Sequence, residues 1–563
     1  MSPLRICSLL LAFYLSFASA SGIAQNAHDH AQPAPLPTLG DWASGAQLFD
    51  GLGRSHRKVS TSSPEAQRYF DQGMRLIWAF NHDEATRSFA RAAQIDPACA
   101  LCYWGVALTL GPNYNMPMMA ETRARVGWEA LGMAKANATK ATPVERALIS
   151  ALAARFAGPQ PLDPANSAPH LSAYVEAMRT VAKEFPRDND VQTLFAEALM
   201  NTNPWKLWNA DGSAGPGTPK IVDTLQKVLA ADPHHPGANH YLIHAVEASK
   251  NPEVALPSAE ALKQMMPGAG HLVHMPSHIM QRVGRYEEAA QANRLGAAAD
   301  LAYLKKTAPP DYYPMYLVHN YQFLAFAAAM EGRSAEAISA GRSARSAMPE
   351  AMLLSMPGLD WSIGYLYDAM IRFGHWDEML REEAPGPKLA GLSISYHQAR
   401  ATALAATGRT TEAQAELAAA KALMAAVPSD AAQGMNAAMS VYEIGQRKAA
   451  ARLASAKGDL GTAITLLQEA AKLEDKLAYN EPEDVFFPVR HLLGASLLDA
   501  GRASEAEAVF REDLRRHPKN GWALTGLRSA LAAQKRSTEI DSIDLQLRDA
   551  WTRADRKIDR AAF

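Results

Sequence analysis

The stretch from residue 66 to residue 97, AQRYFDQGMRLIWAFNHDEATRSFARAAQIDP, decides the fold of this chain. Small residues at spaced positions let two helices approach closely, and a proline ends the second helix because it lacks a backbone N–H. The stretch therefore predicts a hairpin of two tightly packed helices. The positions that carry this pattern are Gly73, Ala85, Phe89, Ala92 and Pro97.

The same pattern returns along the chain in a register close to 34 residues. The sequence resembles the tetratricopeptide repeat family, and more narrowly exported members of the bacterial type. The resemblance implies an all-α, right-handed superhelix of about eleven hairpins, an α-solenoid, although the pattern fades near residues 120–188 and 350–390. The recurring positions are Ala255 and Pro267; Gly284 and Ala289; Gly332 and Ala337; Gly408 and Ala413; Gly458 and Ala463; and Gly494, Gly501, Ala506, Phe510 and Pro518.

Length and composition agree with a repeat array. A chain of 563 residues is too long for one compact core, and its 8% of aromatic residues suits packed helices better than a large sheet. The 56 basic and 58 acidic residues nearly cancel. No strong overall field therefore favours binding to nucleic acid or to an anionic membrane.

The first residues are typical of a secretory signal. Arg5 supplies positive charge, an apolar run extends over residues 6–17, and Ala18-Ser19-Ala20 offers a cleavage site. We therefore expect an exported protein, periplasmic or secreted, with no membrane span in the mature chain, because no later stretch reaches about 20 apolar residues. Cys7 would leave with the signal.

Five segments follow from these patterns. They are the signal peptide (1–20), a flexible leader (21–63), N-terminal helical repeats (64–188), central repeats with a His-rich groove (189–352), and C-terminal repeats with a capping helix (353–563). The leader holds His28-Asp29-His30, a short tract that is usually solvated but could capture an ion. A Pro- and Gly-rich loop over residues 203–217, with Trp205 and Trp208, interrupts the repeats. It either packs over the groove or fills a gap between hairpins.

Cys99 and Cys102 are the two cysteines expected in the mature protein. In an oxidising compartment a local disulfide is the first interpretation. A redox pair or a soft-metal site remains open, although no strand–helix–strand pattern surrounds the pair and Tyr103 stands where a haem attachment sequence has histidine.

Four histidines stand out once the repeat register is known. His240 and His244 are four residues apart, and His274 and His278 repeat that spacing 34 residues later. Residues four apart share one face of a helix, so equivalent helices in neighbouring hairpins would bring the two pairs together. Imidazoles from both sides could then reach metal bonds of about 2.0–2.1 Å.

Acidic and further histidine residues extend the candidate site. Glu247 falls on the same helix as the first pair, Glu197 lies in the preceding hairpin, and His271 and His319 share a position in two successive hairpins. The set suits a divalent transition metal such as copper, zinc or iron. Pro276 makes the place of His274 less regular, because the second helix should start near Met275. His82, at the turn of the first hairpin, fits a structural role.

Several alternatives stay open for the metal. Two Met-containing stretches, 113–119 and 274–280, keep copper in view because thioethers are soft ligands, but methionine is more often packing material. The sequence HYLIHAVE (240–247) has no glutamate between its histidines, so it differs from the zinc peptidase helix. The histidines could also bond one another as neutral tautomers without an ion.

Three functions fit these residues. The first is a metalloenzyme in which Glu247 or Glu197 acts as a ligand or general base on a small molecule or peptide in the concave groove. The second is a metal-binding or delivery protein with a filled coordination sphere. The third is a protein-interaction scaffold, since a fold alone does not define function. A proline-stiffened segment, residues 480–490, either closes the far end of the groove or connects two hairpins.

Overall fold

The structure is a computed structural model that describes residues 37–307, 312–355 and 358–563. In this part of the chain nearly all regular structure is helical, and β1 (Ala432–Gln433) and β2 (Asn436–Ala437) form a short antiparallel ribbon. The predicted all-α class is therefore confirmed. No helix among the described residues has the length and hydropathy to cross a membrane. The predicted signal peptide, Cys7 and His28-Asp29-His30 lie outside the described residues.

The described chain divides into two compact units. The N-terminal unit holds residues 37–279 and 298–307, and the C-terminal unit holds residues 280–297, 312–355 and 358–563. Helix α14 (Tyr286–Leu304) runs from one unit into the other. The boundaries predicted at residues 188 and 352 both fall inside these units.

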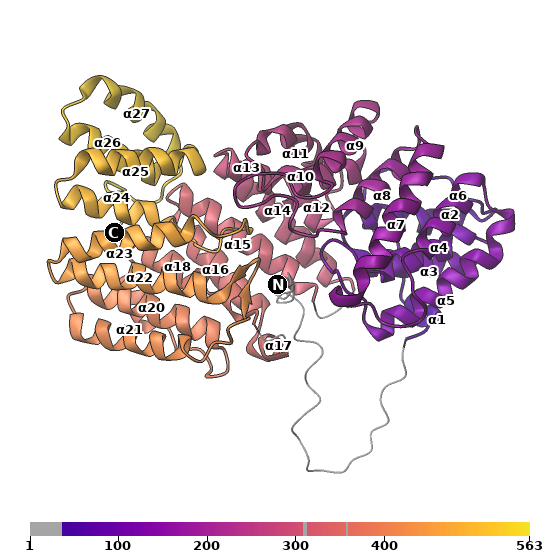
Figure 1. Ribbon diagram of the computed structural model, residues 1–563, viewed down its shortest axis with the longest axis horizontal. Coiled ribbons are helices and arrows are strands. Elements are labelled where there is room, and N and C mark those ends of the chain that lie inside the picture. Colours follow the sequence, from indigo (N-terminus) through magenta and orange to yellow (C-terminus); the bar gives the residue numbers. More distant parts are fainter. Residues whose placement is uncertain (1–36, 308–311, 356–357) are drawn as a thin grey trace, which may run out of the picture. The chain divides into compact units, whose positions relative to one another are not determined.

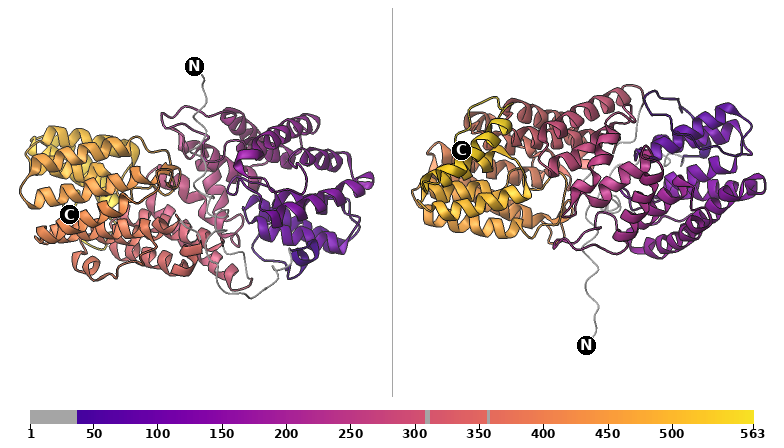
Figure 2. Two further views of the ribbon diagram at one scale, coloured as in Figure 1. Left: turned by 60° about the horizontal axis from the view of Figure 1, so that its bottom comes forward. Right: turned by 90° about the horizontal axis from the view of Figure 1, so that it is seen from above.

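In the N-terminal unit, consecutive helices pair as hairpins: α2 with α3, α4 with α5, α6 with α7, α8 with α9, and α10 with α11. Figure 2 shows the first of them in indigo and violet as antiparallel rods. The elements are α1 (Leu39–Ala43), α2 (Pro64–Trp78), α3 (His82–Ile95), α4 (Ala100–Leu110), α5 (Glu121–Asn137), η2 (Ala138–Lys140), α6 (Pro143–Ala153), α7 (Pro164–Glu184), α8 (Asn189–Met200), α9 (Thr218–Ala231), α10 (Pro236–Val246), η3 (Pro252–Ala255), α11 (Leu256–Leu262), α12 (Gly270–His274) and α13 (Pro276–Arg282), which crosses the boundary.

In the C-terminal unit the paired helices are α15 with α16, α18 with α19, α20 with α21, α22 with α23, α24 with α25, and α26 with α27. In Figure 1, α22 to α27 rise in chain order above α20 and α21. Both units thus contain helical hairpins in chain order, as the repeat pattern predicts. The elements are α15 (Pro314–Met330), α16 (Ser334–Ala347), α17 (Glu350–Ser355), η4 (Asp360–Ile363), α18 (Tyr365–Arg372), α19 (Trp376–Arg381), α20 (Ala390–Ala406), α21 (Thr410–Met424), α22 (Ala438–Ala456), α23 (Leu460–Glu474), α24 (Val489–Asp499), α25 (Ala503–Arg516), α26 (Gly521–Ala533) and α27 (Ser537–Ala550).

The repeat residues explain why these hairpins pack closely. A Cβ atom added at Gly73 or Gly105 would lie 2.6 or 2.4 Å from the ring of Phe89. The late copy repeats this arrangement, because a Cβ at Gly494 or Gly526 would lie 2.3 or 2.1 Å from the ring of Phe510. One aromatic ring thus fills the space that two glycines leave, which is the close approach that the spacing predicts.

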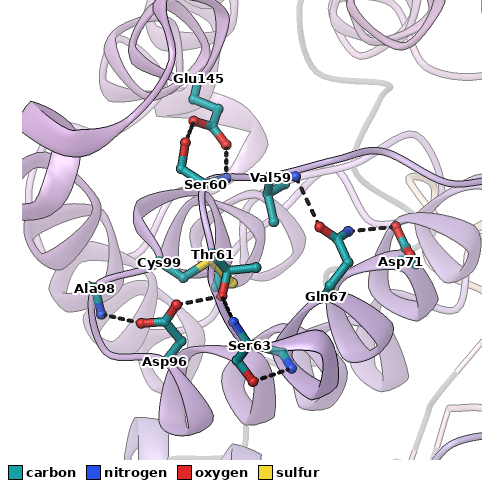
Figure 3. Close-up of a disulfide and its surroundings, with 12 residues drawn as sticks. Val59, Ser60, Thr61, Ser63, Gln67, Asp71, Asp96, Ala98, Cys99 and Glu145 are labelled. Atoms are coloured by element: carbon teal, nitrogen blue, oxygen red, sulfur yellow. Dashed lines mark hydrogen bonds between the residues drawn. A yellow bond between two sulfur atoms is a disulfide. The ribbon is translucent and has the colours of Figure 1, made fainter.

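The described part of the predicted flexible leader is packed against the repeats. Leu52 and Val59 are each 4% exposed, so residues 37–63 are anchored by apolar burial. Figure 3 shows the end of this segment: the Ser60 N–H donates to Glu145 (2.7 Å) and the Thr61 hydroxyl donates to Asp96 (2.5 Å). Composition predicted mobility here because the partners of these polar residues lie far along the sequence.

Cys99 and Cys102 are joined as a disulfide at the start of α4, with their sulfur atoms 2.02 Å apart. Both side chains are fully buried. Figure 3 places the bond beside Thr61, next to the hydrogen bonds that hold residues 59–63. The local disulfide considered from the sequence is thus the arrangement that the structure contains.

Candidate metal centre

Helix α10 carries the first histidine pair and is buried on every side. The His235 imidazole caps its start by accepting the Ala238 N–H (3.0 Å), and Pro236 occupies the first turn. The helix packs against α8, α9 and α2. A helix buried on all faces must satisfy its polar side chains internally. His240 and His244 are 0% and 2% exposed, and Glu247 follows directly at the C-cap, 2% exposed.

The second group of histidines lies on two short helices. His271 and His274 belong to α12, and His278 belongs to α13. The helical stretch begins at Gly270 rather than near Met275, so His271 also stands on a helix. Pro276 divides the stretch because it offers no N–H, although Met275 keeps a helical backbone (φ −52°, ψ −35°). The histidine cluster consists of these five residues: His240, His244, His271, His274 and His278.

Hydrogen bonds fix the orientation of three of these rings. His240 Nδ1 lies 2.6 Å from the Trp78 carbonyl oxygen. Nδ1 of His244 and of His278 lie 2.9 and 2.6 Å from the two oxygens of the Glu247 carboxylate. A carbonyl and an ionised carboxylate only accept, so each Nδ1 donates a proton. In the neutral rings the Nε2 atoms therefore keep their lone pairs.

The ligating atoms of three of these rings converge. The ligating atoms of His240, His244 and His271 all lie within 4.8 Å of one another, and Nε2 of His240 and Nε2 of His271 are 3.2 Å apart. Two nitrogens bound to one tetrahedral ion at 2.0–2.1 Å would be separated by about 3.3 Å. Nε2 of His244 is buried without a hydrogen-bond partner in the described structure. The three histidines are thus placed to hold a metal ion.

His274 and His278 form an adjacent pair. Their Nε2 atoms are 2.6 Å apart, closer than two nitrogens that share one tetrahedral ion. The His274 ring centroid lies 5.8 Å from that of His271, and the His278 centroid lies 5.7 Å from that of His244. His319 stands on α15 in the C-terminal unit, where its ring packs on Phe323 at 4.9 Å.

Burial sets the charge of the cluster. Removal from water lowers the pKa of His240 and of His271 well below the usual value, and the neighbouring imidazoles lower both further. Both rings are therefore neutral, as a metal ligand must be. Burial by itself would raise the pKa of Glu247, but His244 and His278 hold it well below its ordinary value. The carboxylate stays ionised and keeps both imidazoles oriented.

An aromatic wall, consisting of Phe80, Tyr114 and Trp205, lines the cluster. The Phe80 ring centroid is 4.4 Å from that of His240 and 5.6 Å from that of His244. Tyr114 and Trp205 lie 5.5 and 5.6 Å from the His244 centroid. The backbone of Phe80 (φ 53°) and of Trp205 (φ 61°) is left-handed, a strained conformation for such residues.

The loop over residues 203–217 holds Trp205 in this wall. Trp208 Nε1 donates to the Ala245 carbonyl oxygen of α10 (2.7 Å), and Thr218 Oγ1 donates to the Leu207 carbonyl oxygen (2.7 Å). The loop packs over the histidines, which is one of the two arrangements considered from the sequence. Phe80 and Tyr114 were not predicted, because no periodic signal links them to α10.

Two further predicted residues take other positions. Glu197 on α8 is not one of the groups whose ligating atoms converge in the described structure. Its Oε1 accepts from Asn201 Nδ2 (2.5 Å), and burial raises its pKa. His82 stacks on Phe80, with ring centroids 5.6 Å apart, and burial lowers its pKa to about 3. A neutral packing role agrees with the structural assignment of His82.

Comparisons with known proteins show only weak similarity to solved structures. No protein-family model and no curated protein sequence matches the chain. A monomeric mutant of human IFIT1 with Gppp-AAAA is 12% identical over 91% of this chain and 99% of its own (TM-score 0.34). Cut9 in the APC/C tetramer Cut9–Hcn1 is 14% identical over 87% of this chain and 76% of its own (TM-score 0.31). Yeast Tom70 is 10% identical over 85% of this chain and 90% of its own (TM-score 0.29). All three TM-scores are below 0.5, so these structures give no information about the site.

Proposed function

We propose that this protein binds a divalent transition metal ion through Nε2 of His240, His244 and His271. The observation that carries the proposal is the convergence of three imidazoles, one of which has a buried Nε2 without a partner in the described structure. The Trp78 carbonyl and Glu247 would orient the ligands from behind, as outer-shell acceptors do in metal sites.

The donor set narrows the choice of metal. Imidazole nitrogens suit zinc, copper and iron, and no thiolate belongs to the group. Both oxygens of Glu247 already accept from imidazoles, so three histidines describe the site better than two histidines and one carboxylate. Glu247 is therefore proposed as an orienting residue rather than as a ligand or general base.

Three protein nitrogens are the donor count of sites that keep one position for water or substrate. We therefore place a metal-dependent reaction first and metal storage or delivery second. The aromatic wall beside His244 would contact the bound molecule. A scaffold in which these histidines contact a peptide is less well supported, because His240 and His244 are 0% and 2% exposed.

Export remains part of the proposal. Its support is the signal-like sequence over residues 1–20 together with the disulfide between Cys99 and Cys102, a bond that persists in oxidising compartments. Mass spectrometry of the protein from its native host would detect a mature chain that begins after Ala20. A chain that retains Met1 would contradict export by this signal.

Metal analysis of the purified full chain tests the central proposal. We expect one tightly bound transition ion per chain, and loss of that ion when His240 and His244 are both changed to alanine. His234→Ala is the matched control, because His234 is exposed just before α10. X-ray absorption spectroscopy should show nitrogen ligands at about 2.0–2.1 Å. A metal-free wild-type protein after reconstitution, or metal retained by the double variant, would contradict the proposal.

A further inference from the structure

A second site lies wholly inside the C-terminal unit. A pocket bounded by α18, α20, α22 and the segment 484–487 has a cavity volume of about 90 Å³ and is partly open to solvent. Segment 484–487 belongs to the stretch 480–490, so that stretch contributes to a pocket wall as well as connecting two hairpins. The pocket shares no residue with the histidine cluster.

Buried positive charge is the first unusual feature of the pocket. Arg372 is 4% exposed, and its Nε and Nη2 have no hydrogen-bond partner in the described structure. Its guanidinium stacks on the rings of Trp522 (4.1 Å) and Phe487 (5.1 Å). Lys448 lies over Phe487 as well, with Nζ 3.6 Å from the ring centroid. A buried cation without a hydrogen-bonded anion costs several kcal/mol.

Carboxylates lie near each cation of the pocket but do not hydrogen-bond Arg372: Asp513 attracts Arg372, Asp368 and Glu474 attract Lys448, and Asp499 attracts Arg452. The pocket lining holds three cations, Arg372, Lys448 and Arg452, against two acids, Asp368 and Asp484. The oxygens of Asp484 accept from the side-chain amides of Asn436 (2.7 Å) and Asn480 (2.9 Å) rather than from a cation. Nε and Nη2 of Arg372 therefore have no carboxylate partner in the described structure.

The titration of these groups agrees with an unfilled anion position. Burial lowers the pKa of Arg372 to about 9 and that of Lys448 to about 8, so both remain mostly protonated at neutral pH. Asp513 attracts Arg372, but its own oxygens accept from His491 (2.7 Å) and Asn520 (3.0 Å). Burial raises the pKa of Asp368 to about 6. An added anion would relieve the cost of the buried cations.

Aromatic rings define the rest of the lining. Trp361, Trp376, Tyr442 and Phe486 face the same space as Arg372 and Lys448. The indole Nε1 of Trp361 is buried without a hydrogen-bond partner in the described structure, so it is a further donor. Flat rings favour a planar, apolar body, and the unpartnered donors of the buried Arg372 guanidinium favour an anionic acceptor.

We propose that this pocket binds a small aromatic monocarboxylate, with its carboxylate between Arg372 and Lys448 and its ring among the tryptophans. An arginine presents a planar fork of donors that matches a carboxylate. The proposal does not depend on the metal site. It also differs from peptide binding along an open groove, because the cations and rings line one pocket.

Calorimetry and tryptophan fluorescence of the full chain test this, with benzoate and phenylacetate as probes and benzamide as the uncharged control. We expect both carboxylates to bind and benzamide to bind at least ~10-fold more weakly, since a charged hydrogen bond is lost. Lys448→Met should weaken benzoate binding by ~10-fold, whereas Lys448→Arg should retain it. Lys457→Met is the matched control, because Lys457 is exposed at the end of the same helix.

Circular dichroism of each variant shows whether it is folded. If Lys448→Met fails to fold, the comparison of benzoate with benzamide on the wild type and on Lys448→Arg decides. The proposal is wrong if neither carboxylate binds better than benzamide. It is also wrong if folded Lys448→Met binds benzoate as well as Lys457→Met does, or if peptides with a free C-terminal carboxylate bind where benzoate and phenylacetate do not.

Discussion

At the scale of single residues, Glu247 links two histidines of the cluster. One carboxylate oxygen lies 2.9 Å from His244 Nδ1 and the other lies 2.6 Å from His278 Nδ1. An acid between two imidazoles fixes both tautomers, so that the metal-facing nitrogens keep their lone pairs. Its effect on metal binding is therefore indirect and depends on its charge.

Glu247→Gln should lower metal affinity by ~10–100-fold while leaving the fold intact. The glutamine amide has one donor group, which would face an Nδ1–H and force one ring to turn. Titration with a competing chelator measures the affinity. Glu253→Gln, at an exposed site on η3, is the control and should bind metal as the wild type does. Equal affinities of the two variants would show that Glu247 has no orienting role.

Phe80 is the second residue with a testable role. Its ring is 2% exposed, but its backbone is left-handed (φ 53°), which costs about 1–2 kcal/mol for a residue with a Cβ. Replacement by alanine keeps that strain, whereas replacement by glycine removes it.

Phe80→Gly should therefore be more stable than Phe80→Ala by ~1 kcal/mol, although both lose the ring. In an ordinary helix the order is the opposite, because glycine costs about 1 kcal/mol relative to alanine. The same two changes at Phe195, inside α8, provide that reference. Urea unfolding of the four variants gives the values. Greater stability of Phe80→Ala would show that strain at residue 80 is absent.

At the scale of elements, the hairpins around Phe89 and Phe510 depend on glycines that admit one aromatic ring. Gly105 on α4 lies so near Phe89 that an added Cβ would be 2.4 Å from the ring. Gly132 on α5 has no heavy atom within 4 Å of that position. The Cβ position of Gly105 is thus tightly packed, whereas that of Gly132 is open.

Gly105→Ala should destabilise the protein by ~1–3 kcal/mol through overpacking. Gly132→Ala should stabilise it by ~0.5–1 kcal/mol, because alanine favours a helix. Thermal unfolding of the two variants, which add the same methyl group, measures the difference. If both changes shift the midpoint in the same direction, close packing around Phe89 does not hold these hairpins together.

The end of α25 is stabilised by a histidine between two acids. His517 Nδ1 lies 3.2 Å from Asp513, and its Nε2 lies 2.9 Å from Glu483 in the segment before α24. Burial opposes its charge, but the two carboxylates raise the pKa of His517 to about 10, above the ordinary 6.5. The charged pairings therefore contribute fully below pH 6.5, and their contribution is lost as the pH rises toward 10.

His517→Gln should destabilise the protein strongly at pH 6, and the difference from wild type should shrink between pH 6.5 and 10. Unfolding curves across this range provide the measurement. His234→Gln, which changes an exposed histidine, should differ little from wild type at any pH. A difference that stays constant with pH would show that His517 is uncharged in the folded protein.

At the scale of the whole molecule, the two proposed ligand sites belong to different compact units. The histidine cluster lies in the N-terminal unit, and the aromatic pocket lies in the C-terminal unit. A ligand stabilises the structure that binds it, by about 2.7 kcal/mol at 100 times its dissociation constant. Each ligand should therefore protect its own unit.

Hydrogen exchange followed by mass spectrometry should show metal-dependent protection over residues 236–279 and little change over residues 438–531. Removal of metal by a chelator should reverse the effect. The variant with alanine at residues 240 and 244 should show no response, which controls for non-specific ion effects. Equal protection of both units by the metal would contradict a site confined to the histidine cluster.

The hairpins could be predicted from the sequence because their determinants are local. Gly73, Phe89 and Pro97 act within one hairpin, so their spacing predicts its two helices, and the structure confirms the all-α class. His240 and His244 lie four residues apart, which places both on one face of a helix wherever that helix packs. The signal peptide, export and the choice of metal stay predictions.

Only the tertiary structure decided which histidines meet. His271, a flanking residue in the repeat register, lies 3.2 Å from His240, and Pro276 divides the helical stretch that carries it. Trp78 contributes its carbonyl from α2, far away in sequence. Metal ligands must agree within about an ångström, whereas a repeat pattern specifies helix faces and leaves the rotation of one helix against the next to the packing of the whole unit.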